Sequence, residues 1–426
     1  AVTGPNGVRT INDVLFEVPR KGAVLGDSIA ALCLTYSATA SKYSANSWLN
    51  QAQFKLGFPW DIQAADNFAI AGTTSAVILS DQVPLFVASG VRYERVFMSF
   101  GTNDFNAGET LANVISNAKQ IFAAINNTGA IAVHIGVLPR GSGASMTTPK
   151  KKALGFNAWL ARYATENAGI EYIPCGQALA DNSTAFGNAI TGFVDGSILH
   201  PIDPGAYWMG KIIYDFYINR GYSAPTLRFA DSAADFYDAT YNPGGILFTN
   251  PNPLLIGGTT APTGMSTAGS NVTWSKGTNT LDNGQVEATA KATMAGVQNA
   301  YLYDDILATG AWDTENIAEG DDIYAQAIIK CTGLVSDTLP FLQVTENNGT
   351  GGGGVLQNAY CNDATSGTRP TIPDGTYYLR TPNITVRPYS GAGNASVFAK
   401  LNIVSTGAET GVIEILRFEL RKANII

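Results

Sequence analysis

The chain has 426 residues, more than one ordinary hydrophobic core accommodates, so two or three domains are expected. Hydrophobic residues make up 45% and charged residues only 14% of it, with a formal net charge of −8. That balance excludes a nucleic-acid-binding surface, because phosphate contacts need a basic face. The one basic cluster, Lys150 to Lys152, is interpreted as a solvated helix face.

The composition gives little support for a membrane span, a metal site or a disulfide framework. No apolar run approaches the roughly 20 residues that cross a bilayer, so no membrane span is expected. The chain has two histidines, four cysteines and no CxxC spacing, so we expect no metal site and no cofactor. Buried free thiols are predicted for the cysteines, with a Cys331–Cys361 bridge as the alternative.

Short apolar runs alternate with helical stretches up to about residue 222, which is typical of an α/β fold with a parallel sheet between two helix layers. The predicted strands cover residues 22–26, 68–71, 96–100, 130–138 and 170–173. The predicted helices run through residues 48–54, 77–83, 111–122, 154–163 and 204–219. In such folds the functional loops lie beyond the carboxyl ends of the strands.

The pattern changes after residue 222. Residues 223–270 contain many Pro, Gly, Thr and Ser residues and are interpreted as a connecting segment. From there on apolar and polar residues alternate, as in 286–292, 397–403 and 416–421. Half-buried antiparallel strands of this kind predict an all-β sandwich. The expected domains are therefore residues 1–222, α/β, and residues 271–426, all-β.

One tripeptide carries candidate chemistry. Gly26-Asp27-Ser28 stands where the first strand ends and a helix is expected to begin. A serine hydroxyl becomes a nucleophile only when a base takes its proton. On its own Ser28 is equally well explained as a helix cap, so the interpretation depends on a base elsewhere in the chain.

Two histidines could serve as that base. His134 lies inside the predicted strand 130–138, a position typical of a structural residue. His200 lies in a loop before the last predicted helix, five positions after Asp195, whose carboxylate could fix the ring's tautomer. His200 is therefore the candidate base and Asp195 the candidate acid.

Four segments in this order resemble the conserved blocks of the SGNH/GDSL serine hydrolases. Gly26-Asp27-Ser28 matches the nucleophile block, and Asp195 to His200 is similar to the acid–base block. Ala69 to Thr74 resembles the second block and Gly101 to Asp104 the third. The resemblance implies an SGNH-like fold and an oxyanion hole formed by the Ser28 and Gly72 N–H groups and the Asn103 side-chain amide. Gly72 and Asn103 taken singly are explained as turn residues.

The acid–base block departs from the family pattern, which is D-x-x-H. Two additional residues stand between Asp195 and His200, and they must bulge out if the carboxylate is to contact the ring. A Ser28–His200 dyad supported by a backbone carbonyl is the alternative.

The resemblance implies an ester substrate. An acetylated polysaccharide is expected, because an attached β-sandwich is a common way to hold a polymer and no long apolar lid segment is present. The arrangement is also similar to deacetylases of bacteriophage tail spikes, which implies a homotrimer and an extracellular, secreted or virion-displayed protein. The alternatives are a secreted lipolytic esterase or thioesterase, and a catalytically silent glycan- or receptor-binding protein.

Overall fold

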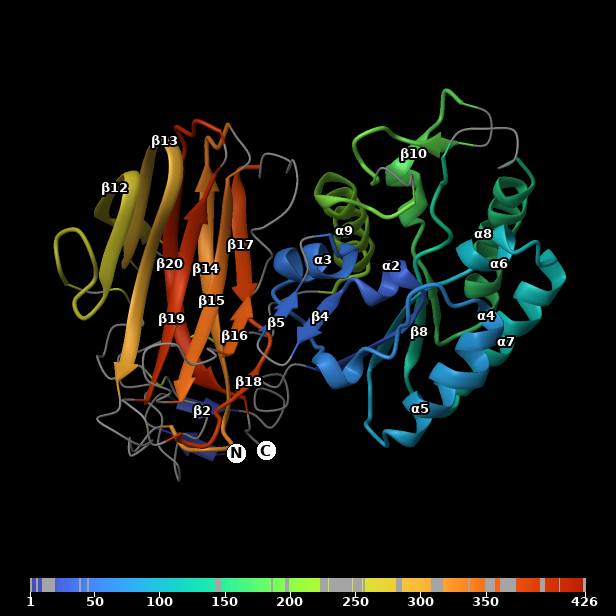
Figure 1. Ribbon diagram of the computed structural model, residues 1–426, viewed down its shortest axis with the longest axis horizontal. Helices are drawn as coiled ribbons and strands as arrows, with labels where there is room; N and C mark the ends of the chain where they lie inside the picture. Colours follow the sequence, from blue (N-terminus) through green and yellow to red (C-terminus); the bar gives the residue numbers. More distant parts are fainter. Residues whose placement is uncertain are drawn as a thin grey trace. The chain divides into compact units, whose positions relative to one another are not determined.

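The computed structural model divides the chain into two compact units (Figure 1). Unit 1 is Ala1–Thr35 with Ser44–Leu227, and unit 2 is Tyr36–Tyr43 with Arg228–Ile426. The residues described are 2–4, 7–9, 20–37, 40–43, 46–141, 147–184, 187–195, 199–222, 229, 247, 255, 257–280, 286–307, 317–335, 338–348, 357–360, 373–390, 395–405 and 407–423.

Unit 1 is built on a five-stranded parallel sheet in the order β6-β3-β7-β8-β9. Its strands are β3 (Arg20–Gly26), β6 (Trp60–Asp61), β7 (Arg95–Ser99), β8 (Ile131–His134) and β9 (Ile170–Tyr172). Four of the five predicted strands are confirmed in place. The fifth, at 68–71, is wrong. Phe68 and Ile70 donate their N–H groups to β3, but a turn at Gly72, with φ of +82°, ends the ladder, and β6 forms the edge instead.

Helices cover both faces of this sheet, which confirms the three-layer α/β prediction (Figure 1). Alternate strand residues such as Leu25 and Met98 face one layer, and Val24 and Phe97 face the other. The first layer holds α4 (Ser75–Val77), the π-helical segment η2 (Ile78–Gln82), α5 (Val83–Ala88), α7 (Leu111–Asn127) and α8 (Thr147–Glu166). The second holds α3 (Trp48–Leu56) and α9 (Asp203–Ile218), which pack on each other.

Short elements complete unit 1. They are α2 (Ser28–Ala31), α6 (Thr102–Asn106), the 3-10 segments η1 (Ala64–Asp66) and η4 (Cys175–Leu179), and the antiparallel pairs β1 (Val2–Gly4) with β2 (Gly7–Arg9) and β10 (Ala180–Asp181) with β11 (Asn188–Ala189).

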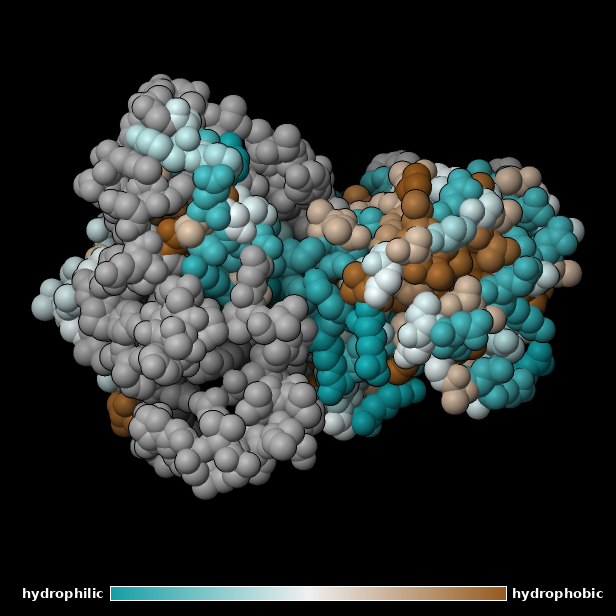
Figure 2. All heavy atoms as spheres, turned by 90° about the horizontal axis from the view of Figure 1, so that it is seen from below, coloured by the Kyte–Doolittle hydropathy of each residue, from teal (hydrophilic) through white to brown (hydrophobic). Residues whose placement is uncertain are grey.

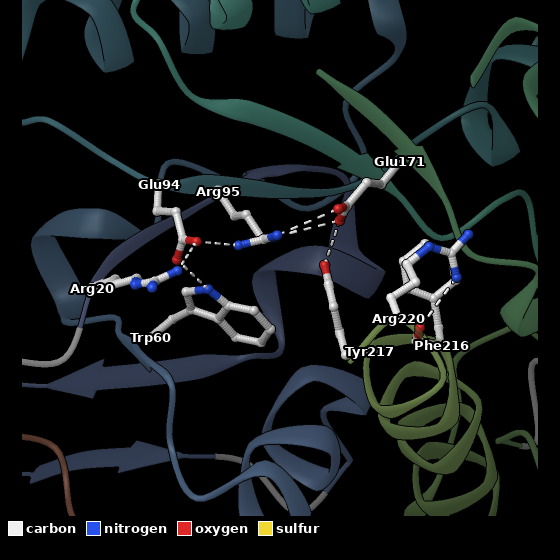
Figure 3. Close-up of polar contacts among 8 residues, drawn as sticks. All are labelled: Arg20, Trp60, Glu94, Arg95, Glu171, Phe216, Tyr217 and Arg220. Carbon is white, nitrogen blue, oxygen red and sulfur yellow. Dashed lines mark hydrogen bonds and ion pairs between the residues drawn. The ribbon is translucent and has the colours of Figure 1, made fainter. Parts of the chain in front are cut away.

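A charged and aromatic cluster closes the amino end of the sheet (Figure 3). The Arg95 guanidinium lies between the carboxylates of Glu94 and Glu171, and it stacks over the Trp60 and Tyr217 rings at 5.6 and 5.2 Å from their centroids. Tyr217, in the last turn of α9, donates its hydroxyl to Glu171 at 2.7 Å. The acids and ring faces around this cation offset the cost of removing it from water. The cluster therefore fixes the carboxyl end of α9 to the sheet.

Unit 2 is all-β. Its strands are β12 (Ser266–Thr280), β13 (Val286–Leu307), β14 (Asp322–Thr332), β15 (Leu339–Asn348), β16 (Gln357–Tyr360), β17 (Gly375–Arg380), β18 (Ile384–Thr385), β19 (Ala395–Val404) and β20 (Val412–Lys422). The long β13 pairs with β20 over its first half and with β19 over its second. It thereby passes from one layer to the other, and β14 contacts β15 across a single apolar core. The predicted β-sandwich is confirmed.

Two features of unit 2 were not predicted. The strand β5 (Ala40–Tyr43) pairs in parallel with β16, and β4 (Leu34–Ser37) lies beside it at the end of the strand order. The strand β12 begins at Ser266, inside the segment 223–270, most of which lies outside the described residues.

Two further expectations concern free cysteines and membrane-spanning helices. Cys33, Cys175 and Cys331 are buried free thiols, as predicted, and Cys361 lies outside the described residues. Among the helices that the structure describes, none is both long and apolar enough to cross a membrane.

Candidate active site

The turn after β3 presents Ser28. Gly26 has φ of +136°, and a Cβ there would collide with the carbonyl oxygen of Ser99, so only glycine fits. The next N–H, that of Asp27, donates to the same Ser99 oxygen at 2.9 Å. Asp27 is also the N-cap of α2, since its side chain accepts from Ile29 N–H at 3.0 Å. The turn thus leaves Ser28 as the first residue of α2, beyond the carboxyl end of the strand.

Ser28, His200 and Asp195 form one hydrogen-bonded chain. The distance from Ser28 Oγ to His200 Nε2 is 2.9 Å, although 172 positions separate the two residues. On the other side of the ring, His200 Nδ1 lies 2.9 Å from Asp195 Oδ2. The side chains of His200 and Asp195 are about one-third exposed, at 31% and 33%, so a substrate from solvent can reach them. The geometry is that of a nucleophile, a base and an orienting acid.

Hydrogen bonds within the loop explain how Asp195 reaches the ring over five positions. Asp195 Oδ1 accepts from the N–H groups of Leu199 and His200, at 3.2 and 3.3 Å. The Asp195 N–H in turn donates to the His200 carbonyl at 2.8 Å. The two residues are therefore joined through backbone and side chain together, and the additional loop residues do not separate them.

The other two predicted residues lie on neighbouring loops and are joined to each other. Asn103 Nδ2 donates one hydrogen to the Thr73 carbonyl at 2.9 Å, and the amide has a second hydrogen to offer. Gly72, next to Thr73, is exposed, and no atom lies within 4 Å of where its Cβ would be. The Ser28 N–H, the first of α2, makes no hydrogen bond to another described residue, whereas the next three N–H groups of the helix donate to Asp27. The Ser28 N–H and the second Asn103 hydrogen are available to an oxyanion.

Gln82 is a supporting residue that the sequence analysis missed. Its fully buried side chain accepts from Gly26 N–H at 2.8 Å and donates to the Gly26 carbonyl at 2.9 Å. It also lies 3.2 Å from the Thr73 hydroxyl, so one amide ties the nucleophile turn to the loop of Gly72. A glutamine on an otherwise apolar helix face is the only sequence signal for this role.

Burial raises the pKa of two acids around this site. Asp27 is fully buried, which raises its pKa to about 7. Burial also raises the pKa of Asp104, whose carboxylate accepts from the Ser75 N–H and hydroxyl and thereby fixes the third block to α4. Both acids support the loops and lie outside the Ser28–His200–Asp195 chain.

His134 has a structural position, as expected. It is fully buried in β8 with its ring edge-on to Phe100, at 4.4 Å between centroids, and its Nδ1 accepts from Gly136 N–H at 2.9 Å. Burial lowers its pKa to about 3, so the ring stays neutral. Within the described ranges, no group of three or more His, Cys, Asp or Glu side chains could hold a metal ion.

The segment that carries this site is similar to known proteins. Residues 24–207 match the model of the GDSL-like Lipase/Acylhydrolase family. Similar solved structures include a family 3 carbohydrate esterase from Talaromyces cellulolyticus, at 15% identity over 47% of this chain and 97% of that one, with a TM-score of 0.36. A GDSL-like lipase from Bacteroides thetaiotaomicron is 16% identical over 47% of this chain and 89% of that one, with a TM-score of 0.36. No curated protein matches the chain.

Proposed function

Because residues 24–207 belong to the GDSL-like lipase/acylhydrolase family, we propose that the chain is a serine esterase with Ser28 as nucleophile and His200 as its base. The observation that carries the proposal is the hydrogen-bonded chain from Ser28 Oγ through the His200 ring to Asp195, with 2.9 Å at each step. A histidine ring with a serine hydroxyl at one nitrogen and an aspartate at the other can take the proton from that hydroxyl.

The proposed reaction has two steps. Ser28 Oγ attacks the ester carbonyl while His200 Nε2 takes its proton, and Asp195 stabilises the imidazolium that forms. The Ser28 and Gly72 N–H groups and the Asn103 amide stabilise the oxyanion. His200 then protonates the leaving alcohol, and a water molecule, deprotonated by the same ring, releases the acid and restores Ser28.

Substitution of the nucleophile tests this mechanism. Ser28→Ala should abolish hydrolysis of p-nitrophenyl acetate and labelling by a fluorophosphonate probe, with the thermal unfolding profile unchanged. Ser116→Ala, at an exposed serine on α7, is the matched control and should behave as the parent. Hydrolysis by Ser28→Ala at the rate of the parent would refute the assignment.

Substitution of the acid separates a triad from a dyad. Asp195→Asn keeps the shape of the side chain but cannot stabilise an imidazolium, so we expect a fall in kcat of about 10⁴-fold. A fall of less than about tenfold would favour the Ser28–His200 dyad.

The proposed substrate is a short acyl ester, acetyl above all, on a polysaccharide. The β-sandwich of unit 2 supports this substrate, because such domains commonly hold a polymer near a catalytic site. Acetyl esters should be hydrolysed faster than octanoyl esters, and acetate should be released from at least one acetylated polysaccharide in a panel. A preference for octanoate would favour a lipolytic esterase or thioesterase.

A homotrimer acting outside the cell, secreted or displayed on a virion, completes the proposal. Apolar side chains gathered on the surface of unit 1 support an assembly, since large exposed patches mark interaction sites (Figure 2). The exposed residues include Val77, Leu85, Val87 and Val91. Light scattering after size exclusion should give three times the 44.9 kDa chain mass, and a plain monomer would remove the trimer from the proposal.

A further inference from the structure

Unit 1 contains a cavity of about 340 Å³ beside the candidate active site. Its walls come from α6, from the first turns of α8 and from the segments that follow β8 and β9. Most of the lining is apolar, including Phe105, Leu138 and Tyr172. The volume lies in the range of small-molecule sites, which starts near 300 Å³.

The cavity shares a wall with the oxyanion loop. Thr102 lines it and directly precedes Asn103. Arg140, on the same wall, donates to the Thr102 carbonyl at 3.2 Å. The cavity therefore adjoins the loop that carries Asn103.

The wall is also held rigidly. The Asn157 amide accepts from Val137 N–H at 2.7 Å and donates to the Val137 carbonyl at 2.9 Å. A preformed wall of this kind lowers the cost of ordering on binding.

Two cations line this mostly apolar space. The predicted solvated position of Lys150 is wrong. The side chain is only 7% exposed, and its ammonium donates to the Asn188 amide oxygen. Arg140 is half-buried. Within the described ranges, neither cation has a carboxylate at ion-pair distance; Lys21, by comparison, has two.

Unpaired buried charge is unfavourable, because removal from water is not repaid by a counter-ion. Burial accordingly lowers the pKa of both groups. Lys150 and Pro149 belong to the first turn of α8, whose helix dipole adds further positive potential. The cavity thus combines apolar walls with two cations that have no carboxylate at ion-pair distance within the described ranges, and an organic anion would stabilise this environment.

We propose that the cavity binds a sugar unit bearing a carboxylate, such as a hexuronic acid, with Arg140 and Lys150 on the carboxylate and the apolar walls on the sugar ring. The inference rests on the proposed esterase function and narrows its substrate to acyl esters of acidic glycans. It adds Arg140 and Lys150 as specificity residues outside the reacting atoms.

A binding measurement tests the cavity independently of catalysis. Titration calorimetry on the full chain would compare glucuronate with glucuronamide, which has the same shape and no charge. We expect glucuronate to bind about tenfold tighter, an effect that weakens as salt is added. Equal affinity for the two sugars would overturn the proposal.

Variants assign the effect to the two cations. Lys150→Met keeps the packing and removes the charge, and Arg140→Gln shortens the reach and removes the charge. Each should weaken glucuronate binding about five- to tenfold, and Arg140→Lys should retain part of it. Lys151→Gln, at the exposed neighbour of Lys150, is the control and should bind as the parent does. Affinity unchanged in both charge-removing variants would refute the assignment.

Kinetics separate this inference from the esterase proposal. On an acetylated polyuronate, Arg140→Gln should raise KM with little change in kcat, whereas Lys151→Gln should leave both values as in the parent. Glucuronate binding without any ester hydrolysis would refute the proposed function and keep the cavity inference. Ester hydrolysis without discrimination between charged and neutral sugars would refute the cavity inference and keep the proposed function.

Discussion

Asp27, next to the nucleophile, provides a test of how burial has shaped this site. Asp27→Asn keeps the oxygen that accepts from Ile29 N–H, and asparagine is as good an N-cap as aspartate. What the substitution removes is the ionisable proton. An unfolded aspartate loses that proton near its ordinary pKa of 3.8, whereas the folded one keeps it until about pH 7.

The sign and the size of the effect follow from that difference. Between about pH 4 and pH 7 unfolding releases a proton, so the free energy of unfolding falls as pH rises, and the loss is complete above pH 7. Since a tenfold change in proton affinity is about 1.4 kcal/mol, a pKa raised from 3.8 to about 7 corresponds to about 4 kcal/mol. Asp27→Asn should therefore unfold with the parent near pH 4 and become more stable than it by up to about 4 kcal/mol at pH 8.

Scanning calorimetry of the full chain at pH 4.5, 6 and 8 measures the difference. Asp81→Asn, at an exposed carboxylate on η2, is the matched control for the removal of one carboxyl group. A difference between Asp27→Asn and the parent that is constant across pH, or a variant less stable than the parent at pH 8, would contradict the assignment of a buried, neutral Asp27.

Substitutions at three further positions test the supports of the site and of the sheet. Gln82→Ala leaves the Gly26 peptide without two buried hydrogen bonds, so it should cost about 2–4 kcal/mol in urea unfolding and lower kcat. Gln82→Glu keeps the acceptor, loses the donor and brings a carboxyl into a fully buried position, so it should also be less stable than the parent, and equal stability of all three would deny the role. Gly26→Ala combines a positive φ with a collision at the Ser99 carbonyl and should cost at least about 3 kcal/mol or prevent folding, so a well-folded, active Gly26→Ala would show that the turn relaxes. Tyr217→Phe removes one hydrogen bond to a carboxylate and should cost about 1–2 kcal/mol in the same unfolding assay, and a variant as stable as the parent would contradict the contribution of that bond.

Continuous apolar runs made the parallel sheet predictable. Residues 22–26 and 96–100 carry such runs and form β3 and most of β7, which are neighbours in the sheet. In unit 2 the alternation at 397–403 is that of β19, where every second residue is buried. Local periodicity is a direct consequence of which side chains meet the core, so the sequence reports it well.

Features set by distant pairing were beyond prediction. Nothing in the sequence of residues 40–43 predicts that they pair with β16, which lies much later in the chain. Leu416 continues the alternation of Phe418 and Leu420, yet the register between β14 and β20 shifts there. Leu416 is thus an extra residue in β20. The residues that face the core before this position are Ile413 and Ile415. A bulge depends on both strands, and one strand's periodicity does not contain it.

The loop of Asp195 shows why residue spacing alone could not decide whether Asp195 contacts His200. Sequence reasoning required two residues to bulge out and left a dyad open, because a count of positions says nothing about where a loop closes. Closure comes instead from the Asp195 carboxylate, which accepts the Leu199 and His200 N–H groups, while its own N–H holds the His200 carbonyl. The carboxylate that closes the loop is thus the one that contacts the ring, so any rearrangement that withdraws it from His200 Nδ1 also gives up the bonds that shape the loop. A longer spacing is tolerated because the acid and the histidine are positioned by each other.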